Sequence, residues 1–198
     1  MIRVIEFFFA PERAWQKIVA ANRGGIWAVF AALLPCMLVG AGIEAFGLIK
    51  AGDKHGEFGH ITRISQELVI RYELTHIVLA FVSVMLSAWV LHAIGLTFDV
   101  RCGFSKTLAT IAYASAPIFL MWAPDGIPAL PTWICWAVGA AITMSLLYHG
   151  VAQLMQPEQT KGFGLYLISM VLITVFTGLS HFIAIEVLHG RFFTKLPL

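Results

Sequence analysis

Five long apolar runs alternate with short polar segments along the 198-residue chain. Each run approaches the length of about 20 helical residues that crosses the hydrocarbon core of a bilayer. Helices satisfy their own backbone polar groups in lipid, so the pattern predicts an all-α polytopic membrane protein with five transmembrane helices in one bundle. The expected spans are residues 26–48, 74–96, 107–122, 133–155 and 163–188.

The first 25 residues are predicted to form an amphipathic segment outside the spans, and residues 189–198 a short tail. Pro11 suits the first turn of a helix. Beyond it, Trp15, Ile18 and Val19 share one face. The opposite face is polar and consists of Glu12, Arg13, Gln16 and Lys17. We expect this helix to lie in the membrane interface, with residues 7–9 dipping into the acyl region. The alternative is a stub packed on the loops.

Composition supports a membrane protein and excludes several other classes. Hydrophobic residues make up 59% of the chain and charged residues only 12%, against about 25% in soluble domains. The net charge of +2 is too small to indicate nucleic-acid binding. Cys36, Cys102 and Cys135 are scattered without a CxxC spacing, so neither a disulfide framework nor a zinc site is indicated.

The polar segment Lys50–Glu73 separates the first two spans. Four apolar positions in its second half are spaced as in a short surface helix, namely Ile61, Ile64, Leu68 and Val69. His55 and His60 lie in the same segment, but no ligand spacing supports a metal site there. We therefore expect a solvated loop that leads through a surface helix into the second span.

Three prolines lie in the turn Ala123–Thr132 between the third and fourth spans, which makes the two spans a hairpin. In and after this hairpin, the motifs Tyr113-Ala-Ser-Ala-Pro-Ile-Phe-Leu120, Leu147-Tyr-His-Gly150 and Gln156-Pro-Glu158 resemble the Yip (Ypt-interacting-protein domain) family, in its short bacterial branch. The resemblance is strongest over residues 104–185. It implies five spans, a cytoplasmic N-terminus and an exported C-terminus.

The resemblance also implies a role without catalysis. Eukaryotic members act in vesicle traffic and contact small GTPases and one another. This chain lacks their long cytoplasmic N-terminal region and the Asp-Leu-Tyr-Gly-Pro motif before the first span. Binding of small GTPases is therefore not carried over to it.

Basic residues favour a cytoplasmic N-terminus, and the resemblance implies that the membrane is the inner membrane. Over the whole chain the bias is weak, but the rule weighs the first helix most. Four basic residues precede that helix, namely Arg3, Arg13, Lys17 and Arg23. The turn Ala123–Thr132 is then expected outside the cell.

Ionisable residues inside the spans are the main candidates for a site, because each is costly in lipid. Glu44 shares a face with Gly40, Ala41 and Gly47, which should direct it towards protein. His181 lies on a polar stripe of span five with Thr174, Thr177 and Gly178. We therefore hypothesise that spans one and five are neighbours and that a buried polar pocket contains Glu44, His181, Thr174 and Thr177. Alternatively, Glu44 reaches the interface and His181 bonds a backbone carbonyl.

Two further pairs of polar residues are weaker candidates. His92 and His149 lie at similar depth in spans two and four. They could bind a haem as its two axial ligands, or each imidazole could simply meet water or headgroups at the interface. Glu73 and His76 form a single Glu-x-x-His pair, whereas di-metal bundles use two such pairs and further carboxylates. No cofactor and no metal is therefore predicted.

The sequence contains no phosphate loop, GxSxG or HExxH motif and no Cys/His pairing, so no enzymatic activity is expected. A membrane adaptor or scaffold fits best, with the bilayer, other membrane proteins or a second copy as partners. A small-solute or ion carrier or channel is the first alternative, suggested by kinks at Pro35 and Pro117 and by Glu44 and His181. The second is a cofactor-bearing or quinone-reactive subunit of a redox complex, resting on the histidines.

Overall fold

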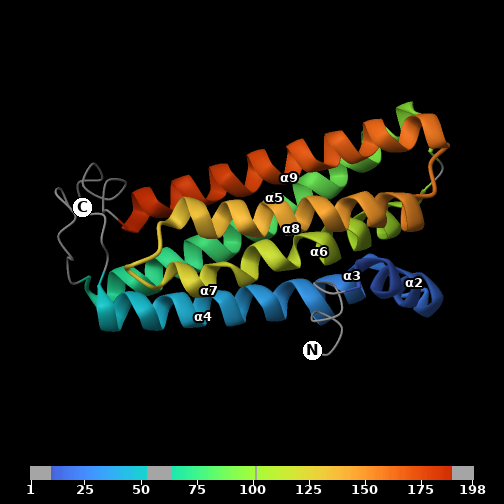
Figure 1. Cartoon of the computed structure of the whole chain (residues 1–198). Coiled ribbons are helices and arrows are strands. Elements are labelled where there is room, and N and C mark those ends of the chain that lie inside the picture. The colour runs from blue at the N-terminus through green and yellow to red at the C-terminus, as the bar shows by residue number, and fades with distance from the viewer. Residues whose placement is uncertain (1–9, 53–63, 101, 189–198) are drawn as a thin grey trace.

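The long helices lie side by side in the computed structural model, as Figure 1 shows. The structure describes residues 10–52, 64–100 and 102–188, and within these ranges the only regular elements are helices. Five helical segments are long and apolar enough to cross a membrane, namely Gly25–Ala51, Gln66–Thr97, Phe104–Asp125, Thr132–Met155 and Thr160–Leu188. The predicted all-α bundle with five spans is confirmed.

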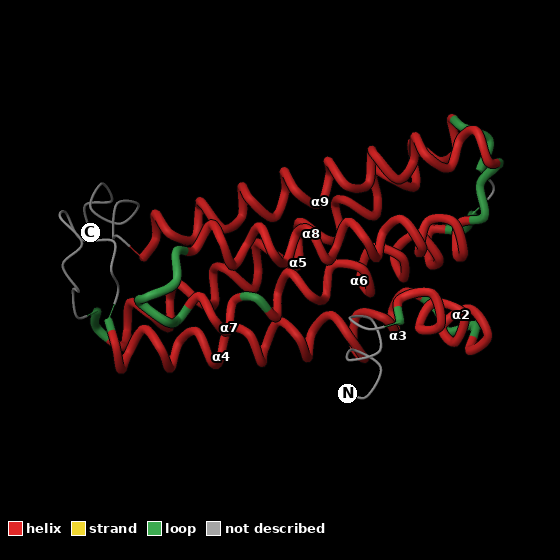
Figure 2. Tube along the Cα trace, in the orientation of Figure 1, coloured by secondary structure: helices red, strands yellow, loops and turns green. Residues whose placement is uncertain are grey.

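Three of the spans consist of more than one helical element. Figure 2 shows the break in the third of the five spans as a green segment between two red ones. The first span contains α3 (Gly25–Ala28), the π-helix η1 (Val29–Leu33) and α4 (Leu34–Ala51). The second is α5 (Gln66–Thr97), and the third contains α6 (Phe104–Leu120) and α7 (Trp122–Asp125). The fourth contains α8 (Thr132–Gly150) and the π-helix η3 (Val151–Met155), and the fifth is α9 (Gln159–Leu188). The short helix α2 (Pro11–Ala21) precedes them all.

The predicted irregularity at Pro35 is a π-helical turn. Pro35 lies in the first turn of α4, directly after η1. Proline has no backbone N–H, so the carbonyl one turn before it cannot receive the usual helical hydrogen bond. A wider turn at this point accommodates the missing bond, as π-bulges in helices commonly do.

The second span begins earlier than the sequence predicted. Helix α5 begins at Gln66, where the hydroxyl of Ser65 accepts a hydrogen bond from the Leu68 N–H at 3.4 Å. Its first turns are amphipathic and carry an exposed Arg71–Glu67 ion pair at 2.6 Å. A hydropathy window misses such turns because exposed charges dominate it. Part of the expected surface helix is thus the start of α5. Its beginning at Ile61 lies outside the described residues, as do the loop residues His55 and His60.

Helix α6 with α7 forms the centre of the bundle. In the most apolar 18-residue stretch of this span, 78% of the residues are buried inside the protein. In the corresponding stretch of α9 the share is 28%. Small and hydroxylated residues make this possible, because other helices can approach them closely. The Ser115 hydroxyl, for example, donates to the Ile111 carbonyl of its own helix at 2.7 Å. Around this centre, α5 packs against α9, α4 and α6, and α8 packs against α6 and α9.

Helix α2 is amphipathic, as predicted, but its apolar face meets protein. Trp15 is fully buried, with its ring edge-on to Tyr113 at a centroid distance of 6.2 Å. A Cβ on Gly150 would lie 2.6 Å from the Trp15 ring, so this glycine makes room for the indole. Val19 remains 36% exposed. The expected placement of residues 7–9 in lipid, like the tail 189–198, lies outside the described residues.

The bundle has two ends, which Figure 1 separates along its long axis. We call the end with α2 the α2 end, and the end where residues 126–131 connect α7 to α8 the turn end. At the turn end, α4 closely approaches the third span. A Cβ on Gly40 would collide with the Phe119 carbonyl oxygen, and one on Gly47 with the Gly126 carbonyl oxygen. These glycines bring α4 into backbone contact with α6 and the turn.

Candidate functional site

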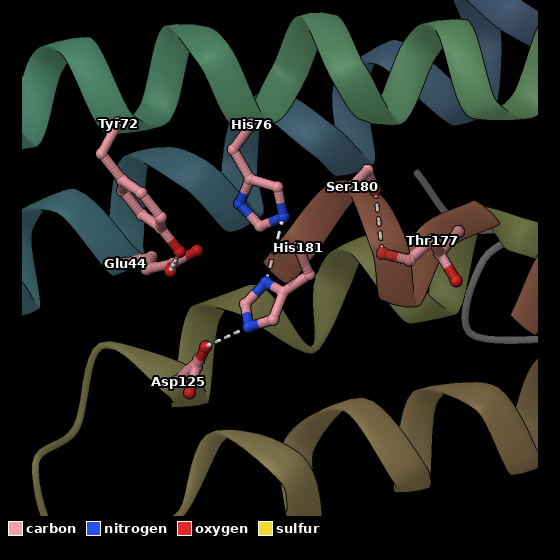
Figure 3. Close-up of polar contacts among 7 residues, drawn as sticks. All are labelled: Glu44, Tyr72, His76, Asp125, Thr177, Ser180 and His181. Atoms are coloured by element: carbon pink, nitrogen blue, oxygen red, sulfur yellow. Dashed lines mark hydrogen bonds and ion pairs between the residues drawn. The ribbon is translucent and has the colours of Figure 1, made fainter. Parts of the chain in front are cut away.

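Six polar side chains from four helices converge near the turn end. We call them the polar cluster: Glu44 of α4, Tyr72, Glu73 and His76 of α5, Asp125 of α7 and His181 of α9. Figure 3 shows five of the six, all except Glu73. Such groups inside membrane spans are rare and commonly mark functional sites.

Glu44 is held by the close approach of α4 to the turn. Its side chain is 2% exposed, and the Tyr72 hydroxyl donates a hydrogen bond of 2.6 Å to its Oε1 atom. A Cβ on Gly126 would lie 2.8 Å from the Glu44 backbone, so the turn packs directly over this residue. Tyr72 is itself 2% exposed. The bond between them thus lies wholly inside the protein.

Two histidines and an aspartate form a chain across the cluster. Nδ1 of His181 lies 3.2 Å from Nε2 of His76, so one of these nitrogens donates to the other. Nε2 of His181 lies 3.9 Å from Oδ2 of Asp125 on the far side of the ring. The His76 ring also stacks on Trp122, with centroids 3.8 Å apart. This stacking fixes the ring plane of His76.

Several polar atoms of the cluster are buried without a hydrogen-bond partner among the described residues. They are Oε2 of Glu44, both carboxylate oxygens of Glu73, and Nδ1 of His76. Ligand atoms of these three residues lie within 4.8 Å of one another. A buried polar atom without a partner costs about 1–3 kcal/mol, and a charged one costs more. The arrangement is therefore suited to binding a positive species, either protons or a metal cation.

The space beside the cluster is small. A cavity of about 20 Å³ borders Glu44, Tyr72, Asp125 and His181, and a second of about 10 Å³ borders Trp122, Asp125 and His181. About one water molecule fits a cavity of this size. Outside it, an open groove of about 420 Å³ runs between α8 and α9, lined by Trp133, Trp136 and Phe182 and reaching His181.

The structure brings together only half of the pocket hypothesised from the sequence. Glu44 and His181 border the same cavity, but the hydrogen bond of Glu44 goes to Tyr72 and that of His181 to His76. Helix α5 packs against both α4 and α9, so it supplies the groups between the two spans. The Thr177 hydroxyl instead donates to the Ile173 carbonyl at 2.6 Å. Thr174 is half-buried and borders neither cavity.

Of the two weaker candidate pairs, only one is brought together. Glu73 and His76 both join the cluster. His92 lies edge-on to Phe104, with ring centroids 5.7 Å apart. His149 lines a groove of about 380 Å³ at the other end of α8. No ring contact or hydrogen bond joins His92 to His149 in the described part of the chain.

Sequence reasoning missed Tyr72 and Asp125. Tyr72 is placed one turn before His76 on α5, so extending the second span backwards would have found it. Asp125 lies in α7, one turn of helix beyond the predicted end of span three. Its position directly after an apolar run is the only signal, because a turn with Pro and Gly normally faces water.

Comparison with known proteins identifies the family of the chain. No curated protein and no solved structure matches the chain. The model of the Yip1 domain matches residues 5–181, which is most of the sequence and includes all five spans apart from the end of α9. This integral membrane protein with five apolar helices therefore belongs to the Yip1 domain family.

Proposed function

We propose that the protein is a non-enzymatic membrane adaptor or scaffold, which binds a transmembrane helix of a partner protein or of a second copy. Membership of the Yip1 domain family fits a role in the membrane. The proposal rests mainly on one residue, Gly42, whose position within the first span has no explanation inside the bundle.

Gly42 differs from the other glycines of α4. Gly40 and Gly47 allow backbone contact with the third span, whereas a Cβ on Gly42 would meet no atom within 4 Å. Glycine costs up to about 1 kcal/mol relative to alanine inside a helix. Gly42 is exposed, between Leu38 and Phe46, which are 58% and 64% exposed. A small residue between two large ones forms a notch, into which the backbone of another helix fits.

The interior of the bundle favours this role over that of a carrier or channel. The central position is occupied by α6, and the cavities at the polar cluster measure only about 20 and 10 Å³. A solute that crosses the membrane needs a path lined by protein groups. A haem held by His92 and His149 is not favoured either, because the two rings contact different neighbours.

The experiment is a comparison of two substitutions at similar depth. Gly42→Leu fills the notch on α4, whereas Ala141→Leu adds the same side chain to an exposed position of α8. We expect the first variant to lose its complex in mild detergent, while the unfolding midpoint of its monomer does not fall. The second variant should keep the complex. A wild-type protein that is monomeric and co-purifies with nothing would overturn the proposal, as would a Gly42→Leu variant with an intact complex.

We also propose the inner membrane as the location, with a cytoplasmic N-terminus. The basic residues before the first span support this orientation. A membrane-impermeant thiol reagent added to intact cells should modify Leu130→Cys and spare Thr160→Cys, since both positions are exposed and lie at opposite ends of the bundle. The native cysteines are buried, so the unmodified parent protein gives the background. Labelling of Thr160→Cys alone would reverse the orientation.

A further inference from the structure

We propose that Glu44, Glu73 and His76 bind a divalent first-row transition metal ion inside the bundle. The sequence predicted no metal, and the adaptor role neither requires nor excludes one. The three side chains come from two helices, and their ligand atoms lie within 4.8 Å of one another. In a closed shell, with metal–ligand distances of about 2.1 Å, neighbouring ligand atoms are about 3.4 Å apart. Side-chain movements on the order of 1 Å close the difference.

All three side chains have buried atoms without partners that are available to a metal ion. Glu44, Glu73 and His76 are 2%, 7% and 1% exposed. Among the described residues, Oε2 of Glu44, both oxygens of Glu73 and Nδ1 of His76 have no hydrogen-bond partner. No described lysine or arginine forms an ion pair with either glutamate. A divalent cation would satisfy all of these acceptors and offset both negative charges.

The surrounding groups orient the three ligands as the outer shell of a metal site does. Metal-binding histidines usually donate their second ring N–H to a neighbouring acceptor, and metal-binding carboxylates are themselves hydrogen-bonded. His76 faces His181 through Nε2 at 3.2 Å, which leaves Nδ1 on the side of Glu44 (Figure 3). Tyr72 holds the other oxygen of Glu44 at 2.6 Å. Both ligands are thus oriented before a metal arrives.

The donor types and the available space define the class of metal. Two carboxylates and one imidazole suit Zn²⁺, Mn²⁺ or Fe²⁺, whereas Mg²⁺ and Ca²⁺ prefer oxygen ligands alone. Of the three ligands, Glu44 borders the cavity of about 20 Å³, which holds a single water or ion and is too small for an organic cofactor. A water in this cavity, beside Glu44, would supply a further ligand.

The test uses the full chain in detergent, stripped with a chelator and then loaded with Zn²⁺ or Co²⁺ alone. We expect one metal ion per chain by elemental analysis, and a Co²⁺ absorption band that Zn²⁺ abolishes and excess Mg²⁺ does not. Retention of less than a tenth of an ion per chain after buffer exchange would overturn the proposal.

Substitutions assign the ion to the cluster. Glu73→Gln keeps the shape of the ligand but removes its charge, and should weaken binding at least tenfold, while Tyr72→Phe should weaken it by about tenfold. Glu67→Gln, on the exposed side of the same helix, is the matched control and should leave the affinity unchanged. Equal affinity of Glu73→Gln and the parent protein would place the metal elsewhere and overturn the proposal.

A measurement on the unmodified protein tests the proposal even if the variants do not fold. X-ray absorption at the zinc edge should show one nitrogen and otherwise oxygen ligands at about 2.0–2.2 Å. Sulfur in the first shell would indicate a cysteine site, and a shell of six waters an adventitious ion. Either result would overturn the assignment to Glu44, Glu73 and His76.

Discussion

At the α2 end, the buried indole of Trp15 lies against Gly150 and Tyr113, whereas at the turn end the buried groups include carboxylates and imidazoles. Both ends are built on the same central helix and both contain closely packed glycines. Two of these glycines differ in what they face: Gly150 at the α2 end faces the Trp15 side chain, whereas Gly40 faces the Phe119 carbonyl, as Gly25 at the α2 end faces the Ser105 carbonyl. A side chain can rotate away from a new atom, but the backbone of a packed helix cannot. A side chain larger than hydrogen should therefore be tolerated less well at position 40 than at position 150.

The largest effect is expected at Gly40. A side chain there collides with the Phe119 carbonyl, so Gly40→Val should lower the free energy of unfolding by about 3 kcal/mol. Gly42→Val on the same helix meets no neighbouring atom and is the control. Unfolding in a denaturing detergent measures both. Equal stability of the two variants would show that α4 does not approach α6 as described.

A somewhat smaller and more local effect is expected at the α2 end. Trp15→Ala removes the buried indole that docks α2, which should lower the opening free energy of this helix by about 2–3 kcal/mol. Hydrogen exchange should speed up in α2 while the unfolding midpoint of the bundle stays unchanged. Val19→Ala, on a partly exposed position of α2, serves as the control. A bundle that unfolds together with α2 would remove the contrast between the two ends.

The bond between Tyr72 and Glu44 should contribute about 1.5 kcal/mol, near the upper limit for interhelical hydrogen bonds in membranes. A double-mutant cycle of Tyr72→Phe and Glu44→Leu in metal-free protein isolates this energy. A parallel cycle that pairs Ser87→Ala with Glu44→Leu is the control. The two losses of stability should be additive, because the Ser87 hydroxyl donates to the Ser83 carbonyl of its own helix. Additivity in the first cycle would mean that the phenol and the carboxylate do not meet.

The smallest effect is expected at Ser105. Its hydroxyl accepts a hydrogen bond from the Gly25 N–H at 2.8 Å, which joins the starts of the first and third spans at the α2 end. Ser105→Ala should cost about 0.6 kcal/mol, the average for such bonds in membranes. Ser105→Thr keeps the acceptor and should recover part of the stability. A loss larger than that of the Tyr72–Glu44 bond would reverse the ranking of the two ends.

The sequence predicted the spans because lipid requires apolar helices of a fixed length, a constraint that acts on each segment separately. It was less accurate at the ends of helices. Helix α5 extends back to Gln66 and the third span forward to Asp125, because polar residues at these ends are either exposed in the first turn or buried by a neighbour. Hydropathy does not distinguish these two situations.

The site was predicted in part. The small-residue face of the first span correctly directed Glu44 into the bundle, because that face depends on local spacing alone. Its partner could not be found in the same way. Which helix lies next to α4 is set by contacts across the whole chain, and α5 rather than α9 supplies Tyr72. The chemistry of the cluster therefore depends on helix order, which no single helix encodes.

The π-helical turn of the first span changes which residues of that span face the interior of the bundle. Stepping back from Glu44 by about 3.6 residues per turn leads to Phe30 and Ile26, which are 65% and 72% exposed. The buried residues of that region include Gly25, Ala28 and Val29 instead. The segments before and after the π turn are thus out of phase by roughly one residue, or about 100°. Deleting a single residue between positions 31 and 33 would convert the π turn into a regular α-helical turn. Phe30 and Glu44 would then be 13 positions apart (44 − 30 − 1), about 220° of rotation, so Glu44 would still face inward and Phe30 outward.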